Sequence, residues 1–586
     1  MDFFLFFNGK IPINEVDTIT EALAGRSYRD FEDAEDFSSF LIESGVVSRP
    51  LNEAGIDKEE KEELKKAASE DAEKEEKEER KESKKDLKKG DEVREVKYAK
   101  LDEIENIFKH IVIFTNDRDP KGNLTLKNIY DAVATLKKAG KPVPELHVFV
   151  AAKVDCDDTE SRILIEDDKG KFEITEQSNL DTLIFSRLGV QGEDQCEHIV
   201  EILQDRGFLV LNPTKYSAVA CNKYETACLL KKGGIPQPNF CLMTKEVLND
   251  DKLYLEALQD VDKKFSGDPD KDEELKVVVK ILDGHGGTGV FMSDGKKLKA
   301  ILQAIFAIDA ERQLIIQRKE EGDGGDIRVH VLTMRDGQVI LGAMKRVQLT
   351  GDFRSNKSLG AETEKVKLTP EQEQIALKTA ELSHMPWCAV DIMPLVKGSN
   401  KELGDNVVLE INASPGTDGI TDVLGHNFIN ILLSNLTKPS EFFIQRKQAG
   451  WLEAIDIWFN EDTHMEFLAK LDTGNGTQAT TVEVGKLDIN DKKAKFTIEG
   501  KEVEMDITGK MTAITGSVKS DRNIVIAPLV RIGLRQMSNV PIALVESREK
   551  STNVLVNRDL LSRLGYVVVS DETHILTPEM EKVNIV

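Results

Sequence analysis

The sequence has few cysteines and no long apolar run. Only six of its 586 residues are cysteine, and no two of them have the spacing of a metal-binding pair. This usage is typical of reduced thiols in a cytosolic protein. No apolar stretch approaches the roughly 18 residues of a membrane-spanning helix. The amino terminus has no basic region before its apolar patch and no small-residue cleavage site, so we expect neither a membrane segment nor a signal peptide.

Positive charge and clustered histidine are also scarce. Lys and Arg number 79 against 105 Asp and Glu, which gives a formal net charge of −26. Because the phosphate backbone of nucleic acids attracts clustered Lys and Arg, we expect no nucleic-acid partner. The nine histidines are scattered and form no His-Glu-x-x-His motif, so the sequence does not predict zinc catalysis.

The length predicts several domains, because 586 residues exceed what one core can organise. Residues 1–56 carry spaced aromatic and aliphatic anchors, which suit a small helical module of unknown role. Residues 57–98 are almost entirely Glu, Lys, Asp and Arg, a pattern that favours a solvated helix or a disordered linker. A binding arm, or glutamates that imitate a substrate or product, is the alternative for this segment. Residues 99–216 alternate strand-like and helix-like patterns, as in an α/β layer.

The segment from Val407 to Ile420 is the most informative part of the chain. It sets Glu410 and Asn412 two residues apart on an apolar strand, and alternate residues of a strand share one face. Asp391 lies in another apolar run. Two carboxylates and an amide oxygen suit a hard cation such as Mg²⁺. Polar residues on the open face of an edge strand are the alternative.

A glycine-rich segment follows an apolar strand that contains Lys280. Gly284, Gly286, Gly287 and Gly289 lie within six residues of one another, and glycines allow a backbone to close over phosphate groups. Hairpin tips also collect glycine, so the order of the motifs along the chain is the stronger evidence.

That order resembles the ATP-grasp superfamily and, within it, the RimK-type glutamate ligases. The resemblance rests on GDFRSN (Gly351 to Asn356), DIRV (Asp326 to Val329) and EINASPGTDGI (Glu410 to Ile420), and spans roughly residues 108–436. It implies a multidomain α/β fold, with a preATP-grasp domain at 99–216 and an ATP-grasp domain at 217–445.

The resemblance also implies ATP, Mg²⁺ (or Mn²⁺) and a set of site residues. Arg318 stands where these ligases usually have an acidic residue. The implied nucleotide contacts are Lys223, Lys280, Gly286 and Gly287 at the phosphates, Gln317, Arg318, Lys319 and Asp326 around adenine and ribose, and Arg354, Ser355 and Asn356. The implied metal ligands are Asp391, Glu410 and Asn412.

The chemistry of such a ligase explains why cations and metal ions meet in one site. The γ-phosphoryl group of ATP moves to a carboxylate, an amine attacks the acyl phosphate, and phosphate leaves as an amide forms. We expect Arg346 and Arg354 at the reacting groups, with solvated surface arginines as the alternative. Arg187 and Arg328 are expected on the substrate side; capping of a loop is the alternative for Arg187.

Residues 446–586 have a different sequence pattern, in which short strand-like runs alternate with turn residues. An apolar strand ends at Asp472-Thr473-Gly474, and Asn557-Arg558-Asp559-Leu560-Leu561 follows downstream. These two motifs together resemble those of the retropepsin-like aspartic peptidases. Because two carboxylates share the catalytic proton in such enzymes, Asp472 needs a second copy of the chain, which predicts a homo-oligomer. A β-barrel used for dimerisation or docking is the alternative.

Together, these features predict a cytosolic ligase that adds glutamate to a carboxylate on a peptide, a protein or free glutamate. The C-terminal domain would then trim a polyglutamate product. Two rival hypotheses remain: a ligase for another amino acid with a non-catalytic C-terminal domain, and a nucleotide-binding scaffold without turnover.

Overall fold

The computed structural model describes most of the chain from Val96 onward. The described residues are 96–99, 108–150, 153–157, 162–174, 178–188, 194–268, 271–272, 274–284, 289–335, 337–347, 362–400, 402–436, 442, 446–490, 492–498, 500–515, 518–546 and 552–577. The N-terminal module and nearly all of the charged linker lie outside them. Five predicted site residues also lie outside: Gly286, Gly287, Arg354, Ser355 and Asn356.

The chain divides into two compact units. The first consists of the chain up to Lys100 with Lys215–Leu332 and Gln338–Phe428, and the second of Leu101–Thr214, Thr333–Gly337 and Ile429–Val586. Each unit contains its own clusters of buried apolar side chains.

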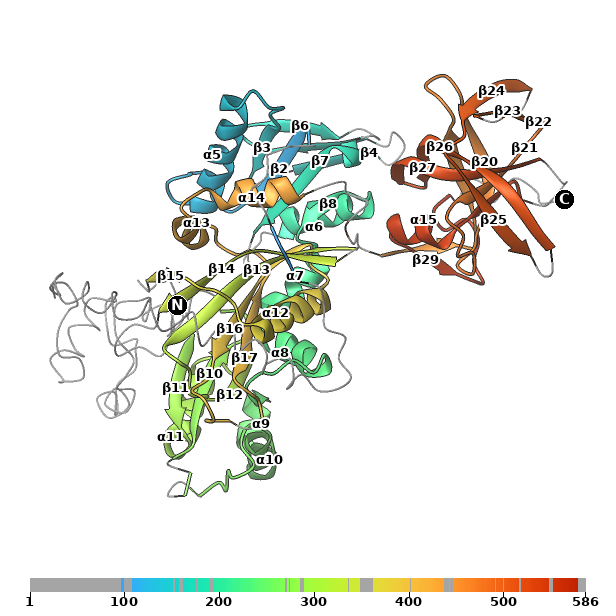
Figure 1. Cartoon of the computed structure of the whole chain (residues 1–586). Helices are drawn as coiled ribbons and strands as arrows, with labels where there is room; N and C mark the ends of the chain where they lie inside the picture. The colour runs from blue at the N-terminus through green and yellow to red at the C-terminus, as the bar shows by residue number, and fades with distance from the viewer. Residues whose placement is uncertain are drawn as a thin grey trace, which may run out of the picture. The chain divides into compact units, whose positions relative to one another are not determined.

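The larger sheet of the first unit has the strand order β1-β14-β13-β16-β17, and β15 pairs with β14. Figure 1 shows helix α12 (Pro370–Ser383) alongside β16 and β17, on which it packs. Thr369 and Gln372 cap the start of α12 reciprocally, which satisfies otherwise unpaired backbone N–H groups. The strands are β1 (Lys97–Tyr98), β13 (Gly325–Met334), β14 (Gly337–Val347), β15 (Thr363–Lys365), β16 (Trp387–Pro394) and β17 (Asn406–Asn412).

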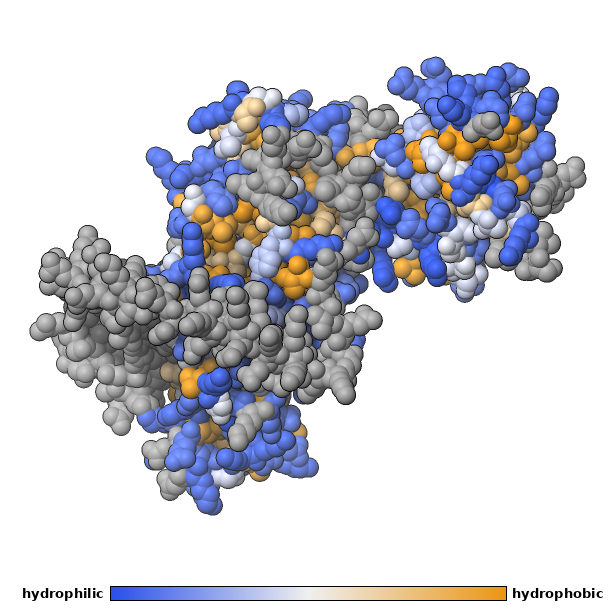
Figure 2. Space-filling model, viewed as in Figure 1, coloured by the Kyte–Doolittle hydropathy of each residue, from blue (hydrophilic) through white to orange (hydrophobic). Residues whose placement is uncertain are grey.

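The second sheet of this unit is antiparallel, with the order β11-β10-β12-β9. Its helices α10 and α11 are amphipathic: Leu258 and Leu302 point into the core, and the surface around both helices is mostly hydrophilic (Figure 2). The elements are β9 (Phe240–Met243), β10 (Lys276–Ile281), β11 (Val290–Asp294), β12 (Leu314–Arg318), α9 (Lys245–Asn249), α10 (Asp251–Val261) and α11 (Gly295–Ile308).

Three further helices belong to this part of the chain: α7 (Thr214–Cys221), α8 (Lys223–Lys232) and α13 (Asp418–Leu424). The sequence predicts a helix that starts at Lys223 and ends at Gly233 and Gly234. Helix α8 confirms this prediction, with Gly233 as its C-cap. Gly234 follows with a φ of 64°, a conformation that glycine adopts without strain.

The N-terminal part of the second unit is built on a parallel sheet with the order β3-β2-β7-β8. Helix α5 connects β2 to β3 and helix α6 connects β7 to β8, as is usual for parallel pairing, so the predicted strand-helix-strand layer is confirmed. A small antiparallel sheet, β4-β5-β6, is inserted. The elements are β2 (His110–Thr115), α5 (Leu124–Lys138), β3 (Glu145–Phe149), β4 (Lys153–Asp157), β5 (Arg162–Glu166), β6 (Lys171–Ile174), η3 (Ser178–Leu180), β7 (Thr182–Arg187), α6 (Asp194–Asp205) and β8 (Leu209–Leu211).

The C-terminal region forms a β-barrel, which agrees with the predicted all-β domain. Its sheet runs β19-β20-β28-β21-β27-β26-β25, and pairing of β19 with β26 closes it. Closure leaves few exposed strand edges. Helix α14 (Phe428–Asn435) precedes this region. The elements of the region are β18 (Lys447–Gly450), β19 (Leu452–Trp458), β20 (His464–Leu471), β21 (Thr480–Val484), β22 (Leu487–Ile489), β23 (Lys493–Ile498), β24 (Lys501–Asp506), β25 (Gly509–Thr515), β26 (Val518–Ile532), β27 (Arg535–Glu546), β28 (Val554–Val556), α15 (Arg558–Arg563) and β29 (Tyr566–Val569).

Two expectations from composition can be checked in the described residues. Cys221, Cys228, Cys241 and Cys388 are free thiols. Within the same residues, none of the helices combines the length and the apolar character needed to cross a membrane.

Candidate active site

A charged cluster lies on one face of the larger sheet of the first unit. Arg328 on β13 is directly opposite Asp391 on β16, which in turn is opposite Glu410 on β17. Directly opposed residues of antiparallel strands point to the same face. Asn412, two residues beyond Glu410, shares that face. The strand spacing therefore brings Glu410 and Asn412 next to Asp391.

Asp391 is the centre of the cluster and is only 1% exposed. Arg328 donates to both of its carboxylate oxygens, Nε to Oδ1 at 2.8 Å and Nη2 to Oδ2 at 2.7 Å. Arg346 on β14 donates from Nη2 to Asp391 Oδ2 at 2.7 Å and from Nε to Asp326 Oδ1 at 2.6 Å. A buried charge is tolerated when it is paired and hydrogen-bonded in this way.

These pairs keep the cluster ionised. Burial by itself would raise the pKa of Asp391, but the guanidinium groups of Arg328 and Arg346 hold it well below its ordinary value. Burial likewise opposes the charge of Arg346, but Asp391 and Asp326 raise its pKa above the ordinary value. Protonation near neutral pH therefore does not disturb this network.

The oxygen atoms beside this network suit a hard divalent cation. Asn412 Nδ2 lies 3.1 Å from Asp391 Oδ2 and 3.4 Å from Glu410 Oε1, and the Glu410 side chain is 35% exposed. Rotation of the Asn412 amide would turn its oxygen toward the two carboxylates. Carboxylate and amide oxygens are the ligands that Mg²⁺ prefers, so the donor set fits the predicted metal.

Two lysines from other elements of the same unit lie near Glu410: Lys223 at the start of α8 and Lys280 on β10. Burial lowers the pKa of Lys280, on β10, to about 8, although the charge of Glu410 opposes this shift. The pKa of Lys223 is lowered by burial too, again opposed by Glu410. Lys223 Nζ donates to the carbonyl of Gly284, at the start of the glycine-rich segment. Two partly buried ammonium groups beside the predicted metal ligands would suit the binding of phosphate groups.

The residues predicted near adenine follow one another at the end of β12. Gln317 is buried. The Arg318 side chain is 40% exposed and lies 3.6 Å from Asp262 and 3.7 Å from Glu320. Lys319 Nζ donates to the carbonyl of Glu320 at 2.5 Å, and burial lowers its pKa. Their role at the nucleotide stays a prediction.

Two other predicted residues have partners inside the protein. Asp326, expected near the ribose, is buried and accepts the hydrogen bond from Arg346. Arg187 belongs to the second unit, where its Nη2 donates to Thr125 Oγ1 at 3.4 Å and burial lowers its pKa to about 10. The double pairing of Arg346 was not predicted. The sequence offered one signal for this cluster: Asp326 and Arg328 are two residues apart on one strand and therefore point to the same face.

In the barrel, the turn that contains Asp472 lies beside the start of α15. Strand β20 ends at Leu471 and pairs in parallel with β28, which precedes Asn557. The backbone N–H of Asp472 donates to Val556 O at 3.1 Å, and the N–H of Gly474 donates to Asp472 Oδ1 at 3.0 Å. Two motifs that are far apart in the sequence thus meet in one place.

Comparison with known proteins finds a family model that matches part of the chain. Residues 220–436 match the model of the RimK-like ATP-grasp domain. The chain is 29% identical over 218 residues to a probable alpha-L-glutamate ligase of Vibrio atlanticus, covering 34% of this chain and 68% of the relative. It is 30% identical over 185 residues to probable alpha-L-glutamate ligase 2 of Pseudoalteromonas atlantica, covering 30% of this chain and 58% of the relative.

The solved structures that match part of the chain include an ATP-grasp ligase and a synthetase. The ATP-grasp ligase PsnB complexed with a minimal precursor is 17% identical, with a TM-score of 0.37, over 56% of this chain and 100% of that chain. D-alanyl-alanine synthetase A from Vibrio cholerae is 17% identical, with a TM-score of 0.39, over 56% of this chain and 95% of that chain. Another PsnB structure contains Mg and ADP. None of these findings shows a retropepsin-like domain. The family match covers residues 220–436, which are similar to the RimK-like ATP-grasp domain.

Proposed function

We propose that the chain is an ATP-dependent carboxylate–amine ligase that adds glutamate to a carboxylate acceptor. One observation carries the proposal: the oxygen ligands Asp391, Glu410 and Asn412 converge on one sheet face, with Lys223 and Lys280 beside them. We propose glutamate as the added amino acid because the relatives are named as probable alpha-L-glutamate ligases. The acceptor is a carboxylate on a peptide, a protein or free glutamate.

Each group has a role in this reaction. Lys223 and Lys280 bind phosphate oxygens of ATP. Asp391, Glu410 and Asn412 hold Mg²⁺ or Mn²⁺, which neutralises phosphate charge when bound. The acceptor carboxylate takes the γ-phosphoryl group and ADP forms; the amine of glutamate then displaces phosphate, so that an amide results.

The two arginines of the cluster have different roles in this proposal. Arg346 is buried, and two of its nitrogens bind carboxylates, so we assign it the positioning of Asp391. Arg328 also binds Asp391, but its Nη2 lies 3.9 Å from Glu410 Oε1, toward the exposed side of the cluster. Arg328 is thus the arginine of the cluster that is closer to an incoming carboxylate.

Mass spectrometry tests the ligase. The purified chain is incubated with ATP, Mg²⁺ and glutamate, with Glu410→Gln as the inactive variant and Glu402→Gln, an exposed glutamate of the same domain, as the matched control. We expect glutamyl additions and ADP from the parent and from Glu402→Gln, and neither from Glu410→Gln. Absence of both products from the parent overturns the proposal and favours a nucleotide-binding scaffold. ADP with no addition favours a different amino acid or acceptor.

We propose a second activity, the trimming of the glutamyl product by the C-terminal barrel. The meeting of the Asp472 turn with the start of α15 supports it. Since one chain supplies one such Asp, the activity requires a homo-oligomer with two copies of Asp472 at one site.

The rate of polyglutamate hydrolysis tests this second activity. Asp472→Asn should abolish hydrolysis, whereas Asp462→Asn, in an exposed turn of the same barrel, should not change it. Equal rates in the parent and in Asp472→Asn would leave the barrel a dimerisation or docking role.

A further inference from the structure

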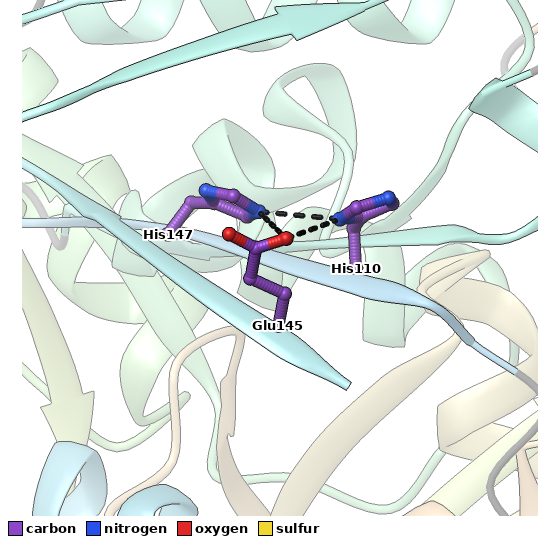
Figure 3. A group of neighbouring side chains, drawn as sticks. All are labelled: His110, Glu145 and His147. Atoms are coloured by element: carbon purple, nitrogen blue, oxygen red, sulfur yellow. Dashed lines mark hydrogen bonds and ion pairs between the residues drawn. The ribbon is translucent and has the colours of Figure 1, made fainter. Parts of the chain in front are cut away.

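Two histidines and a glutamate converge on the parallel sheet of the second unit. His110 lies on β2, and Glu145 and His147 lie on β3. Their side chains point toward one another, with the Glu145 carboxylate beside both imidazole rings (Figure 3). His110 Nδ1 lies 3.2 Å from His147 Nε2 and 3.6 Å from Glu145 Oε2, and His147 Nε2 lies 3.9 Å from the same oxygen.

The strand register produces this arrangement. His110 is paired with Glu145 in the parallel ladder, and His147 is two residues beyond Glu145, hence on the same face. Phe172 of β6 packs against both imidazoles, with ring centroids 4.1 Å from His147 and 5.1 Å from His110. This contact restrains both rings in the orientation that makes their nitrogens converge.

The three atoms have the separation expected of ligands on one small ion. A point equidistant from atoms at these separations lies about 2.1 Å from each, which is the length of a Zn–N or Zn–O bond. Imidazole nitrogens select zinc and neighbouring transition metals over Mg²⁺, which prefers oxygen ligands.

We propose that His110, Glu145 and His147 form a Zn²⁺ site in the second unit. Three protein ligands leave a fourth position for water or for a further ligand, and the Glu145 side chain, 68% exposed, gives that position access to solvent. Because β3 is the edge strand of its sheet, a bound ion would cross-link this edge to β2. The site depends neither on the ligase proposal nor on its metal ligands.

Zinc titration of the full chain by calorimetry tests the site. The buffer contains excess Mg²⁺ so that the oxygen ligands of the ligase cluster are occupied. We expect one equivalent of Zn²⁺ to bind the parent and to raise its melting temperature. His147→Ala and Glu145→Gln should weaken binding by about tenfold or more. Glu145→Gln is the safer variant for folding, because this side chain is largely exposed.

His198 provides a matched control. On α6, His198 Nδ1 lies 3.8 Å from Glu201 Oε2, and the His198 side chain is 74% exposed, so it offers a His–Glu pair without a second histidine. His198→Ala should retain the affinity of the parent. The proposal is overturned if the parent binds no zinc, or if it binds no more tightly than Glu145→Gln with both proteins folded. Equal losses in His198→Ala and His147→Ala would also overturn it.

Discussion

The charged cluster around Asp391 and the turn around Asp472 differ in how fully one chain supplies their partners. Asp391 is buried and receives hydrogen bonds from two guanidinium groups on β13 and β14 of the same sheet. Asp472 is partly exposed and accepts a hydrogen bond from Gly474 of its own turn. A buried charge must find its partners within the fold, whereas an exposed carboxylate is solvated by water and remains available to a second copy. One chain thus supplies the partners of Asp391, whereas the proposed peptidase site at Asp472 would need two copies.

Asp391→Asn should give the largest effect in this comparison. The substitution removes a proposed metal ligand and leaves the two arginines without their carboxylate, so ADP formation should fall by about a thousandfold or more. Stability should fall by about 3 kcal/mol or more as well, since a buried pair is broken. Initial rates of ADP release and thermal unfolding measure the two effects. Asp405→Asn, at an exposed position before β17, is the control, and more than a tenth of the parental rate in Asp391→Asn would contradict the assignment.

Lys280→Met should weaken ATP binding by about a hundredfold, because a charge-assisted contact to phosphate is lost. Lys276→Met, at the exposed start of the same strand, should bind ATP like the parent. Because the pKa of Lys280 is lowered to about 8, its positive charge is present below that pH and is lost above it. ATP affinity, measured by calorimetry, should therefore decrease as the pH rises through about 8 in the parent but not in Lys280→Met.

Glu453→Gln tests, within the barrel, the rule that a buried charge must find its partners inside the fold. Glu453 is 0% exposed and accepts hydrogen bonds from Gly450 N at 2.6 Å, Leu576 N at 3.1 Å and Thr577 Oγ1 at 2.7 Å. An amide cannot accept all of these bonds, so the free energy of unfolding should fall by about 2 kcal/mol. Asp472→Asn should change the free energy of unfolding by less than about 0.5 kcal/mol, because Asp472 is partly exposed and lies in a turn. Denaturant unfolding compares the two, and equal losses would show that Asp472 is structural.

Arg318→Ala should have the smallest effect. Its side chain is exposed and its ion pairs at 3.6 and 3.7 Å are loose, which makes each worth less than about 1 kcal/mol. The KM for ATP should change by less than about threefold. A change of more than about tenfold would place Arg318 at the nucleotide, as the family resemblance implies.

Local patterns predicted much of this protein. The alternation of a strand predicted that Glu410 and Asn412 share a face, and the glycines after Lys232 predicted where α8 ends. The strand-like runs and turn residues that begin near residue 446 predicted an all-β region. Local alternation indicates only that Asp326 and Arg328 share a face. It does not predict the pairing of Arg346 with both Asp326 and Asp391, since these residues are 20 and 45 positions away.

The sequence by itself determined which residues carry charge, which of them share a strand face and where helices begin and end, because these properties depend on neighbours within a few positions. Only the tertiary structure decided which strands are adjacent and in what register. Arg328 meets Asp391 across 63 residues of sequence, and His110 meets His147 because β2 pairs with β3. Such pairing is selected by packing of the whole core, since a shift of one residue would turn every side chain of a strand to the opposite face.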